Sequence, residues 1–339
     1  MEHIIDTKTP DRMKPTTAQE SPCASPDTPD TSGCGRVSSL VQQKEVDGRD
    51  VFVKSYFDAE SKTISALARA RAAREIEVLE HLAQHLDNTS RLRSVQLVSA
   101  EPEQATLTTQ KTTGETLQEC LNGPFYSGRR PEGLRALWLA GRWLQSFQAM
   151  PTAEGHGTVL GRFNPPGLIE YCVLRLDTIR ESDRTLVSPL LRDRLLDTLE
   201  HLLHEAPTNE KQPVWCHRDF APVNILWDGR AIIGLDFAMS ALDVPLLDAS
   251  YFIHRLEMTK LYSPWKRWPV DRWKRAFLRG YGRAEADRSP MYRALEIRHL
   301  LCRLQTYVRR DSTGWKQRLH NTWVRKRVLA ELARRVPVV

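Results

Sequence analysis

Three polar residues near the middle of the chain, Asp219, Asn224 and Asp236, have side-chain types and a spacing that suit joint chemistry. In phosphoryl transfer, one Asp accepts the proton of the attacking hydroxyl, and an Asn and a second Asp hold Mg²⁺ between the phosphates of ATP. Mg²⁺ prefers oxygen ligands and keeps several waters, so one amide and one carboxylate suffice. The sequence therefore predicts a phosphoryl-transfer site with Asp219 as the base.

Two short apolar runs within residues 225–235 separate Asn224 from Asp236 and must position them. Asp228-Gly229 joins the runs, and Asp-Gly between apolar stretches favours a hairpin. Such a hairpin returns both polar residues to the same end of a strand pair. Taken singly, Asp and Asn also suit an ordinary turn, but their combined spacing favours the catalytic interpretation.

The region before this segment is expected to form a small unit that contains both strands and a helix. Residues 40–46 and 50–57 alternate around Asp-Gly and favour a second hairpin. Residues 62–87 have helical apolar spacing, and strand candidates follow at 94–100 and 105–110.

Most of the remaining sequence favours helices, and the block containing Asp219 interrupts them with short strands. The helix candidates are 115–122, 132–150, 166–181, 187–205, 245–260, 270–283, 288–310 and 314–335.

Composition narrows the class of protein. The formal net charge of +7 favours anionic partners, although Arg is spread along most helices and predicts a solvated surface rather than a nucleic-acid patch. The six cysteines form no CxxC pair, which is typical of reduced thiols. No apolar run is long enough to span a bilayer and no signal core is present, so we expect a cytoplasmic protein.

The block HRDFAPVN, followed by an apolar strand, Asp236-Phe237 and DVPLLDAS, resembles the aminoglycoside phosphotransferase and choline kinase family. The resemblance implies an α+β, protein-kinase-like fold of two lobes. The N-lobe is small and β-rich with one long helix, and the larger C-lobe is mostly helical. The expected divisions are a disordered tail at 1–34, the nucleotide-binding N-lobe at 35–112 and the C-lobe at 113–339. The resemblance further implies that Asp248 is a structural carboxylate that holds the catalytic loop.

The resemblance also implies ATP and Mg²⁺ as cofactors, with residues of the N-lobe around the nucleotide. Lys54 matches the lysine that contacts the α- and β-phosphates, and Glu75 matches the helix glutamate that orients it, with Glu77 as the competing candidate. Backbone groups near Thr109 to Lys111 match the hinge that binds adenine.

The glycine-rich loop is where the sequence departs from the family pattern. Residues 32–39, SGCGRVSS, either cover the phosphates with backbone N–H groups or end the tail. A Walker A motif is absent, which argues against a P-loop enzyme.

The acceptor is expected to be a hydroxyl of a small molecule: an aminoglycoside, a sugar or an amino alcohol. Too few residues separate Asp236 from DVPLLDAS and the helix after it for the activation segment of a protein kinase, and no A-P-E element is present. Residues 262–283 mix aromatic and basic side chains, which leaves open a lipopolysaccharide-sugar kinase at the inner membrane face with peripheral membrane contact. An inactive kinase-fold scaffold is the second alternative. Nucleic-acid binding rests on the pI alone, and no nucleic-acid partner is expected.

Overall fold

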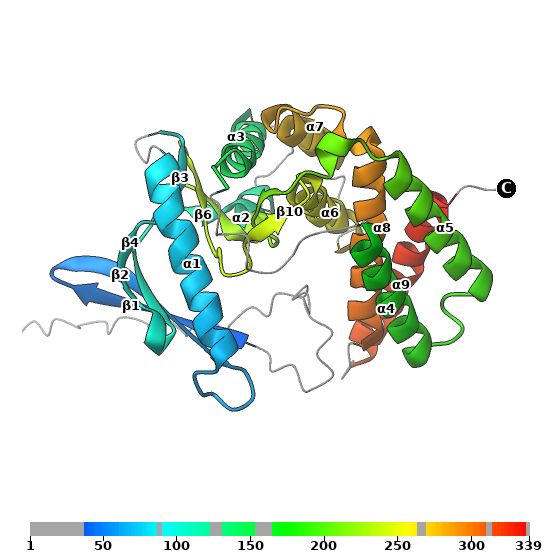
Figure 1. Cartoon of the computed structure of the whole chain (residues 1–339), viewed down its shortest axis with the longest axis horizontal. Helices are drawn as coiled ribbons and strands as arrows, with labels where there is room; N and C mark the ends of the chain where they lie inside the picture. The colour runs from blue at the N-terminus through cyan, green and yellow to red at the C-terminus, as the bar shows by residue number, and fades with distance from the viewer. Residues whose placement is uncertain are drawn as a thin grey trace, which may run out of the picture.

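The computed structural model has a β-rich N-terminal part and a larger helical C-terminal part (Figure 1). The residues that it describes are 37–86, 90–122, 131–152, 165–262, 269–309 and 314–336. The predicted α+β, kinase-like architecture is confirmed. The predicted tail at 1–34 and most of the glycine-rich segment at 32–39 lie outside the described residues.

The N-terminal part is an antiparallel sheet with strand order β1-β2-β5-β4. Its strands are β1 (Val37–Val46), β2 (Arg49–Asp58), β4 (Leu97–Glu101) and β5 (Thr106–Gln110). Asp47 and Gly48 join β1 to β2 with φ angles of 52° and 73°. Positive φ at both turn residues explains why Asp-Gly is favoured there and why the predicted hairpin formed.

Helix α1 (Ala66–His85) connects β2 to the rest of the sheet and runs along it (Figure 1). The side chain of Ser65 accepts a hydrogen bond from the backbone N–H of Ala68, which is the usual N-cap arrangement. The predicted helix began at residue 62, and this was wrong by four residues. Lys62 has φ 58°, a left-handed conformation that cannot continue into a helix, so the helix starts only after the Ser65 cap.

A second sheet, with strand order β3-β9-β8-β6, contains strands from both halves of the chain. Its strands are β3 (Leu92–Ser94), β6 (Glu115–Thr116), β8 (Ile225–Trp227) and β9 (Ile232–Gly234). The predicted strand at 94–100 is in fact divided: β3 pairs in parallel with β9, and β4 pairs with β5. The predicted N-lobe thus contributes a strand to the sheet that carries the catalytic hairpin.

The C-terminal part is mainly helical, and its helices match the predicted ranges to within three residues at each end. They are α2 (Leu117–Asn122), α3 (Pro131–Gln148), α4 (Pro165–Ser182), α5 (Pro189–Glu205), α6 (Leu246–Tyr262), α7 (Val270–Gly280), α8 (Pro290–Arg309) and α9 (Trp315–Arg335). A short antiparallel pair, β7 (Val214–Cys216) and β10 (Ala241–Asp243), flanks the catalytic segment. In Figure 1, α4, α5, α8 and α9 form the end of the molecule farthest from the N-terminal sheet.

Two glycines allow α3 and α7 to cross at very close range. A Cβ on Gly280 would lie 1.9 Å from the carbonyl oxygen of Trp138, and one on Gly141 would lie 2.2 Å from that of Phe277. Nearby, the ring of Trp143 fills the space beside Gly234 and stacks on Phe220 at 5.5 Å. This aromatic core lies directly beneath the catalytic hairpin and fixes its position.

None of the helices among the described residues has the length and apolar character that crossing a bilayer requires.

Candidate active site

The catalytic loop is anchored from below by one buried carboxylate. Asp248, at the start of α6, accepts hydrogen bonds from the backbone N–H groups of His217 at 2.6 Å and Arg218 at 2.8 Å. Arg218 has φ 64°, an unfavourable conformation for a residue with a Cβ, so the loop needs this anchoring. The predicted structural role of Asp248 is confirmed by these two bonds.

His217 is a structural residue in this loop and does not face a ligand. It is fully buried, and its Nε2 lies 2.8 Å from the carbonyl oxygen of Leu235. Its ring packs at 5.1 Å from Phe237. The side chain therefore ties the catalytic loop to the strand that leads to Asp236.

Asp219 and Asn224 contact each other directly. The amide Nδ2 of Asn224 donates to the backbone carbonyl of Asp219 at 2.9 Å and to its Oδ2 at 3.0 Å. Both amide hydrogens are used in this way, so the amide oxygen of Asn224 is left as an acceptor. Both residues are half-buried. This orientation is the one that a metal-binding Asn requires.

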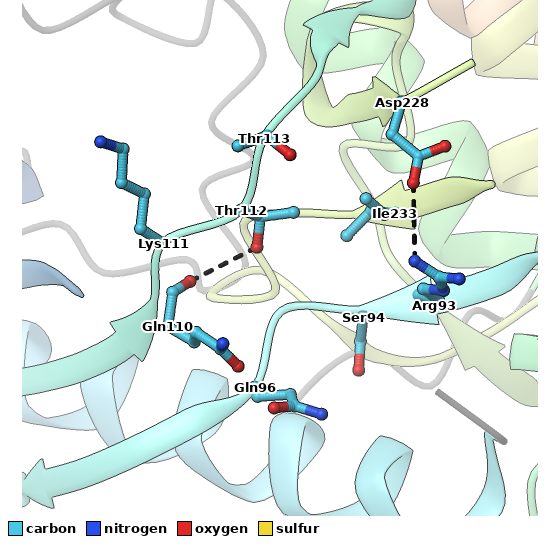
Figure 2. A pocket seen from close by; sticks show the side chains of 9 residues that line it. All are labelled: Arg93, Ser94, Gln96, Gln110, Lys111, Thr112, Thr113, Asp228 and Ile233. Carbon is cyan, nitrogen blue, oxygen red and sulfur yellow. Dashed lines mark hydrogen bonds and ion pairs between the residues drawn. The ribbon is translucent and has the colours of Figure 1, made fainter. Parts of the chain in front are cut away.

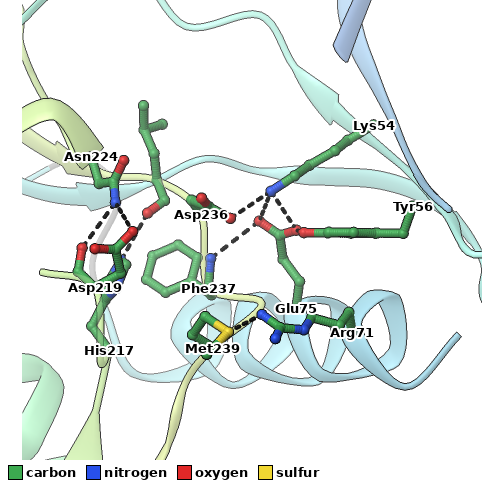
Figure 3. Close-up of polar contacts among 11 residues, drawn as sticks. Lys54, Tyr56, Arg71, Glu75, His217, Asp219, Asn224, Asp236, Phe237 and Met239 are labelled. Carbon is green, nitrogen blue, oxygen red and sulfur yellow. Dashed lines mark hydrogen bonds and ion pairs between the residues drawn. The ribbon is translucent and has the colours of Figure 1, made fainter. Parts of the chain in front are cut away.

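Lys54, on β2, joins the two lobes through ion pairs. Its Nζ lies 2.9 Å from Glu75 on α1 and 2.7 Å from Asp236 (Figure 3). Tyr56 also donates a short hydrogen bond to Glu75. We call Lys54, Tyr56, Glu75 and Asp236 the Lys54 network. The predicted pairing of Lys54 with Glu75 is confirmed.

Glu77, the competing candidate, has a different partner. Its carboxylate lies 2.7 Å from Arg74, one helical turn away on α1. Positions 75 and 77 are two residues apart, so they lie on different faces of the helix.

Charge within the Lys54 network fixes the protonation of its members. Burial disfavours the charged form of Lys54, but Asp236 and Glu75 outweigh it and raise the pKa of the lysine well above its usual value. Burial acts to raise the pKa of Asp236, and Lys54 opposes this so that the pKa is lowered. The network therefore holds a protonated lysine next to an ionised carboxylate at neutral pH.

The backbone around Asp236 is held in an uncommon conformation. Asp236 has φ 62°, and the next N–H, that of Phe237, donates to Glu75 at 3.2 Å. As a result, the side chain of Asp236 is 46 % exposed and faces away from the aromatic core. Glu75 thus positions both Lys54 and the turn that presents Asp236.

Arg71 is a site residue that sequence reasoning missed. It lies one turn before Glu75 on α1, and its guanidinium contacts the sulfur of Met239, three residues after Asp236 (Figure 3). Its charge also acts to lower the pKa of Asp236. The i, i+4 spacing to Glu75 was the available signal, because it places both side chains on one face of the helix.

The predicted hinge lies between β5 and β6. Thr109 pairs with Phe52 on one side and Leu97 on the other, within the sheet. The backbone N–H of Lys111 donates to the carbonyl oxygen of Asp50 at 3.1 Å, and its Nζ lies 3.0 Å from the Asp50 carboxylate. The N–H of Lys111 is therefore occupied, and an adenine contact in this stretch depends on other backbone groups.

A polar recess of about 220 Å³ borders the same stretch (Figure 2). It is lined by Arg93, Ser94, Gln96, Gln110, Lys111, Thr112, Thr113, Asp228 and Ile233. Arg93 and Asp228 form an ion pair across it at 3.5 Å. Adenine requires apolar surfaces for its ring faces, and Ile233 is the only apolar side chain in this lining. We do not assign the nucleotide to this recess.

The oxygen donors fit a divalent metal of the magnesium type. Asp236 supplies an ionised carboxylate and Asn224 an amide oxygen, both hard ligands. Among the described residues there is no cluster of three or more His, Cys, Asp or Glu side chains that would form a complete protein cage. Mg²⁺ needs none, because it is usually held by one or two carboxylates plus phosphates and water.

The sequence profile of the phosphotransferase enzyme family matches residues 38–296, well over half of the chain. This chain belongs to the phosphotransferase enzyme family. The match includes Lys54, Glu75 and the whole catalytic block. The predicted enzyme class, a phosphotransferase, is confirmed. No curated protein sequence gave a match.

Solved structures of the same fold extend over nearly all of this phosphotransferase. A thermostable mutant of aminoglycoside phosphotransferase APH(4)-Ia, bound to AMP-PNP and hygromycin B, has a TM-score of 0.54 at 17 % identity, covering 90 % of this chain and 92 % of its own. Plasmodium vivax ethanolamine kinase has a TM-score of 0.53 at 12 % identity, covering 88 % and 81 %. Amicoumacin kinase hAmiN, in complex with AMP-PNP, Ca²⁺ and Ami, has a TM-score of 0.53 at 12 % identity, covering 86 % of each chain. At these identities the likeness establishes the fold.

Proposed function

We propose that this protein transfers the γ-phosphate of ATP to a hydroxyl of a small molecule of the aminoglycoside, sugar or amino alcohol class. Asp219 accepts the hydroxyl proton, and Asn224 and Asp236 hold the metal. Lys54, oriented by Glu75, binds the α- and β-phosphates, and backbone groups near Thr109 and Lys111 contact adenine. Bound Mg²⁺ neutralises charge on the phosphates and lowers the barrier to transfer.

The observation that carries this proposal is the position of Lys54. Its ammonium group contacts Glu75 and Asp236, two residues separated by more than 160 positions in sequence. A buried lysine between two carboxylates serves folding alone poorly, because its desolvation offsets much of the Coulomb attraction. The arrangement is well suited to binding a nucleotide, since the lysine lies beside the carboxylate that would hold the metal.

The residues around Asp219 account for its proposed role as base. Asn224 donates to Asp219 Oδ2, and this hydrogen bond fixes the orientation of the carboxylate toward the acceptor hydroxyl. The rigid loop below it, held by Asp248, keeps the carboxylate aligned between acceptor and phosphate. Positioning of this kind is the main contribution of a protein to phosphoryl transfer.

We also propose a cytoplasmic location and a lobe boundary near residue 112, which the short β5–β6 connection supports. Peripheral membrane contact through residues 262–283 stays a sequence prediction. Residues 263–268 of that segment lie outside the described residues.

The deciding experiment is Mg²⁺-dependent binding of ATP, measured by calorimetry on the wild type and on Asp236→Ala. We expect binding in the wild type that disappears with EDTA and weakens at least tenfold in the variant. Asp271→Ala is a matched control, because it removes an 81 % exposed carboxylate on α7 that lies outside the site.

Two results would contradict the assignment. Unchanged Mg·ATP affinity in Asp236→Ala would exclude Asp236 as the metal ligand. Absence of ATP binding in the wild type would instead favour the kinase-fold scaffold.

A further inference from the structure

Two arginines from different helices lie against one aromatic ring in the C-terminal part. The guanidinium of Arg175 on α4 is 4.3 Å from the ring centre of Tyr171, and that of Arg298 on α8 is 4.6 Å from it. The two cations therefore lie within about 9 Å of each other. We call these three residues the arginine cluster.

Arg175 is buried but has no acidic partner in the part of the chain that the structure describes. It is 7 % exposed, and its Nε is fully buried without a hydrogen bond. No ion pair among the described residues involves it. A guanidinium in this state is unfavourable unless an anion completes it, because burial of an unpaired charge has a large free-energy cost.

Arg192, on the neighbouring helix α5, is paired with carboxylates, as is usual for a partly buried arginine. Its Nε is also buried without a hydrogen bond, yet its terminal nitrogens lie 3.4 Å from Asp177 and 3.5 Å from Asp193. The chain thus supplies carboxylates to Arg192 and none, among the described residues, to Arg175.

The charges of the arginine cluster and of the catalytic loop act on the same buried carboxylate. Asp243 on β10 lies 3.5 Å from Arg218, the residue before Asp219, and the charges of both Arg218 and Arg298 act on it. Arg298 and Arg175 together act on Cys172. Arg298 also lies 3.4 Å from Nδ1 of His299, whose Nε2 lies 2.9 Å from Ser250 on α6, two residues after Asp248.

The titratable groups behind the arginine cluster do not neutralise it. His254 and His299 are buried, and burial together with nearby arginines lowers the pKa of each well below its usual value, so both are neutral. Asp248 is already committed to two backbone N–H groups. Asp243 lies 3.5 Å from Arg218, and the charge of Arg298 also acts on it.

We propose that the acceptor of this kinase carries an anionic group, a carboxylate or a phosphate, which binds at Arg175 and Arg298 while its hydroxyl faces Asp219. The proposal rests on the proposed kinase function and narrows its acceptor class. Planar guanidinium groups suit carboxylate and phosphate oxygens, which they bind in pairs of parallel hydrogen bonds. A polycationic acceptor would meet repulsion at the same place.

The first test uses sulfate as the probe and does not depend on catalysis. Full-length protein is saturated with Mg·AMP-PNP, and sodium sulfate is titrated against sodium chloride at constant ionic strength while the melting temperature is followed. We expect a saturable increase for the wild type, and at least a tenfold weaker apparent sulfate affinity for Arg175→Gln. Arg192→Gln, the matched control, should stay within twofold of the wild type.

A second variant protects the test against misfolding. Arg298→Gln changes a half-buried residue on another helix that also lies against Tyr171, and should weaken sulfate binding by a similar factor. The proposal would be overturned if sulfate did not raise the melting temperature of the wild type. It would also be overturned if the increase were equal in the wild type and in both variants. An adventitious ion only, bound elsewhere, would give that second pattern.

The second test measures phosphotransfer to hydroxy acids and sugar phosphates, compared with neutral sugars and kanamycin. We expect turnover with anionic acceptors, and a KM raised at least tenfold in Arg175→Gln with kcat changed less than threefold. Preference for kanamycin or a neutral sugar would overturn the proposal. Absence of Mg·ATP binding in the wild type would instead contradict the kinase function itself. Failure of the acceptor proposal and failure of the kinase proposal are therefore distinguishable.

Discussion

The Lys54 network and the arginine cluster treat buried charge in opposite ways. In the network, Lys54 contacts two carboxylates at 2.9 and 2.7 Å, and Glu75 also receives hydrogen bonds from Tyr56 and Phe237. In the cluster, two guanidinium groups share one tyrosine ring, and Arg175 has no acidic partner among the described residues. The charges of the Lys54 network are paired within the protein, whereas the charge of the arginine cluster is paired by a bound anion.

This difference corresponds to what each side must bind. Nucleotide and metal bring a fixed pattern of charge, so a preorganised lysine and carboxylate suit every member of the family. The acceptor differs between family members, and helices α4 and α8 lie far from the N-terminal sheet (Figure 1). Charge on that side is therefore free to vary with the substrate.

The largest expected effect comes from Asp219, which belongs to neither region. Asp219→Asn keeps the shape of the side chain but removes the proton acceptor, so kcat with any accepted substrate should fall by about 10² to 10⁴. Mg·ATP affinity should change less than twofold, because Asp219 belongs to neither charged region. Steady-state rates, calorimetry and circular dichroism of the purified variant measure the three quantities. Retention of most of the turnover would exclude Asp219 as the base.

The next prediction tests the pairing of charges in the Lys54 network, with a pair of isosteric variants on one helix. Glu75→Gln leaves Lys54 with a single carboxylate in a site where the Glu75 side chain is 4 % exposed. We expect unfolding free energy to fall by about 2 to 4 kcal/mol in a urea titration, and Mg·ATP affinity to fall as well.

Glu77→Gln is the control for this experiment. Its carboxylate is 33 % exposed and pairs with Arg74 only one turn away, so the loss should stay below about 1 kcal/mol. Equal losses in the two variants would show that Glu75 is an ordinary helix-surface charge.

The sequence predicted the nucleotide side well, for identifiable physical reasons. Asp47-Gly48 determines a hairpin by its positive φ angles, and helical apolar spacing located α1 and the C-terminal helices. The motif around Asp219 predicted Asn224 and Asp236, the family resemblance implied Lys54 and Glu75, and the structure brings these residues to one site (Figure 3).

The acceptor side was not predictable in the same way. Tyr171, Arg175 and Arg298 belong to no motif, and α4 and α8 meet through tertiary packing that no local pattern specifies. The parallel pairing of β3 with β9 was missed for the same reason, since its two strands are separated by more than 130 residues. In sequence, Arg175 is one of many arginines, and only its burial without a carboxylate distinguishes it.

The smallest expected effect concerns Asp243, the buried carboxylate 3.5 Å from Arg218 of the catalytic loop. Burial raises the pKa of Asp243 to about 6, although Arg218 and Arg298 act to lower it. Its pKa in the unfolded chain is about 3.9. Between these values the folded state binds more protons than the unfolded state, so the unfolding free energy should decrease as pH rises through this window.

The corresponding variant, Asp243→Asn, should remove this contribution, which is on the order of 1 to 3 kcal/mol between about pH 4 and pH 6. Urea unfolding of the wild type and the variant at several pH values measures the difference in slope. Asp177→Asn, at a 46 % exposed carboxylate, should keep the wild-type slope. An unchanged slope in Asp243→Asn would mean that Arg218 and Arg298 already keep Asp243 ionised. The positive charge of the acceptor side would then be partly neutralised within the protein, and less of it would remain for an anionic substrate.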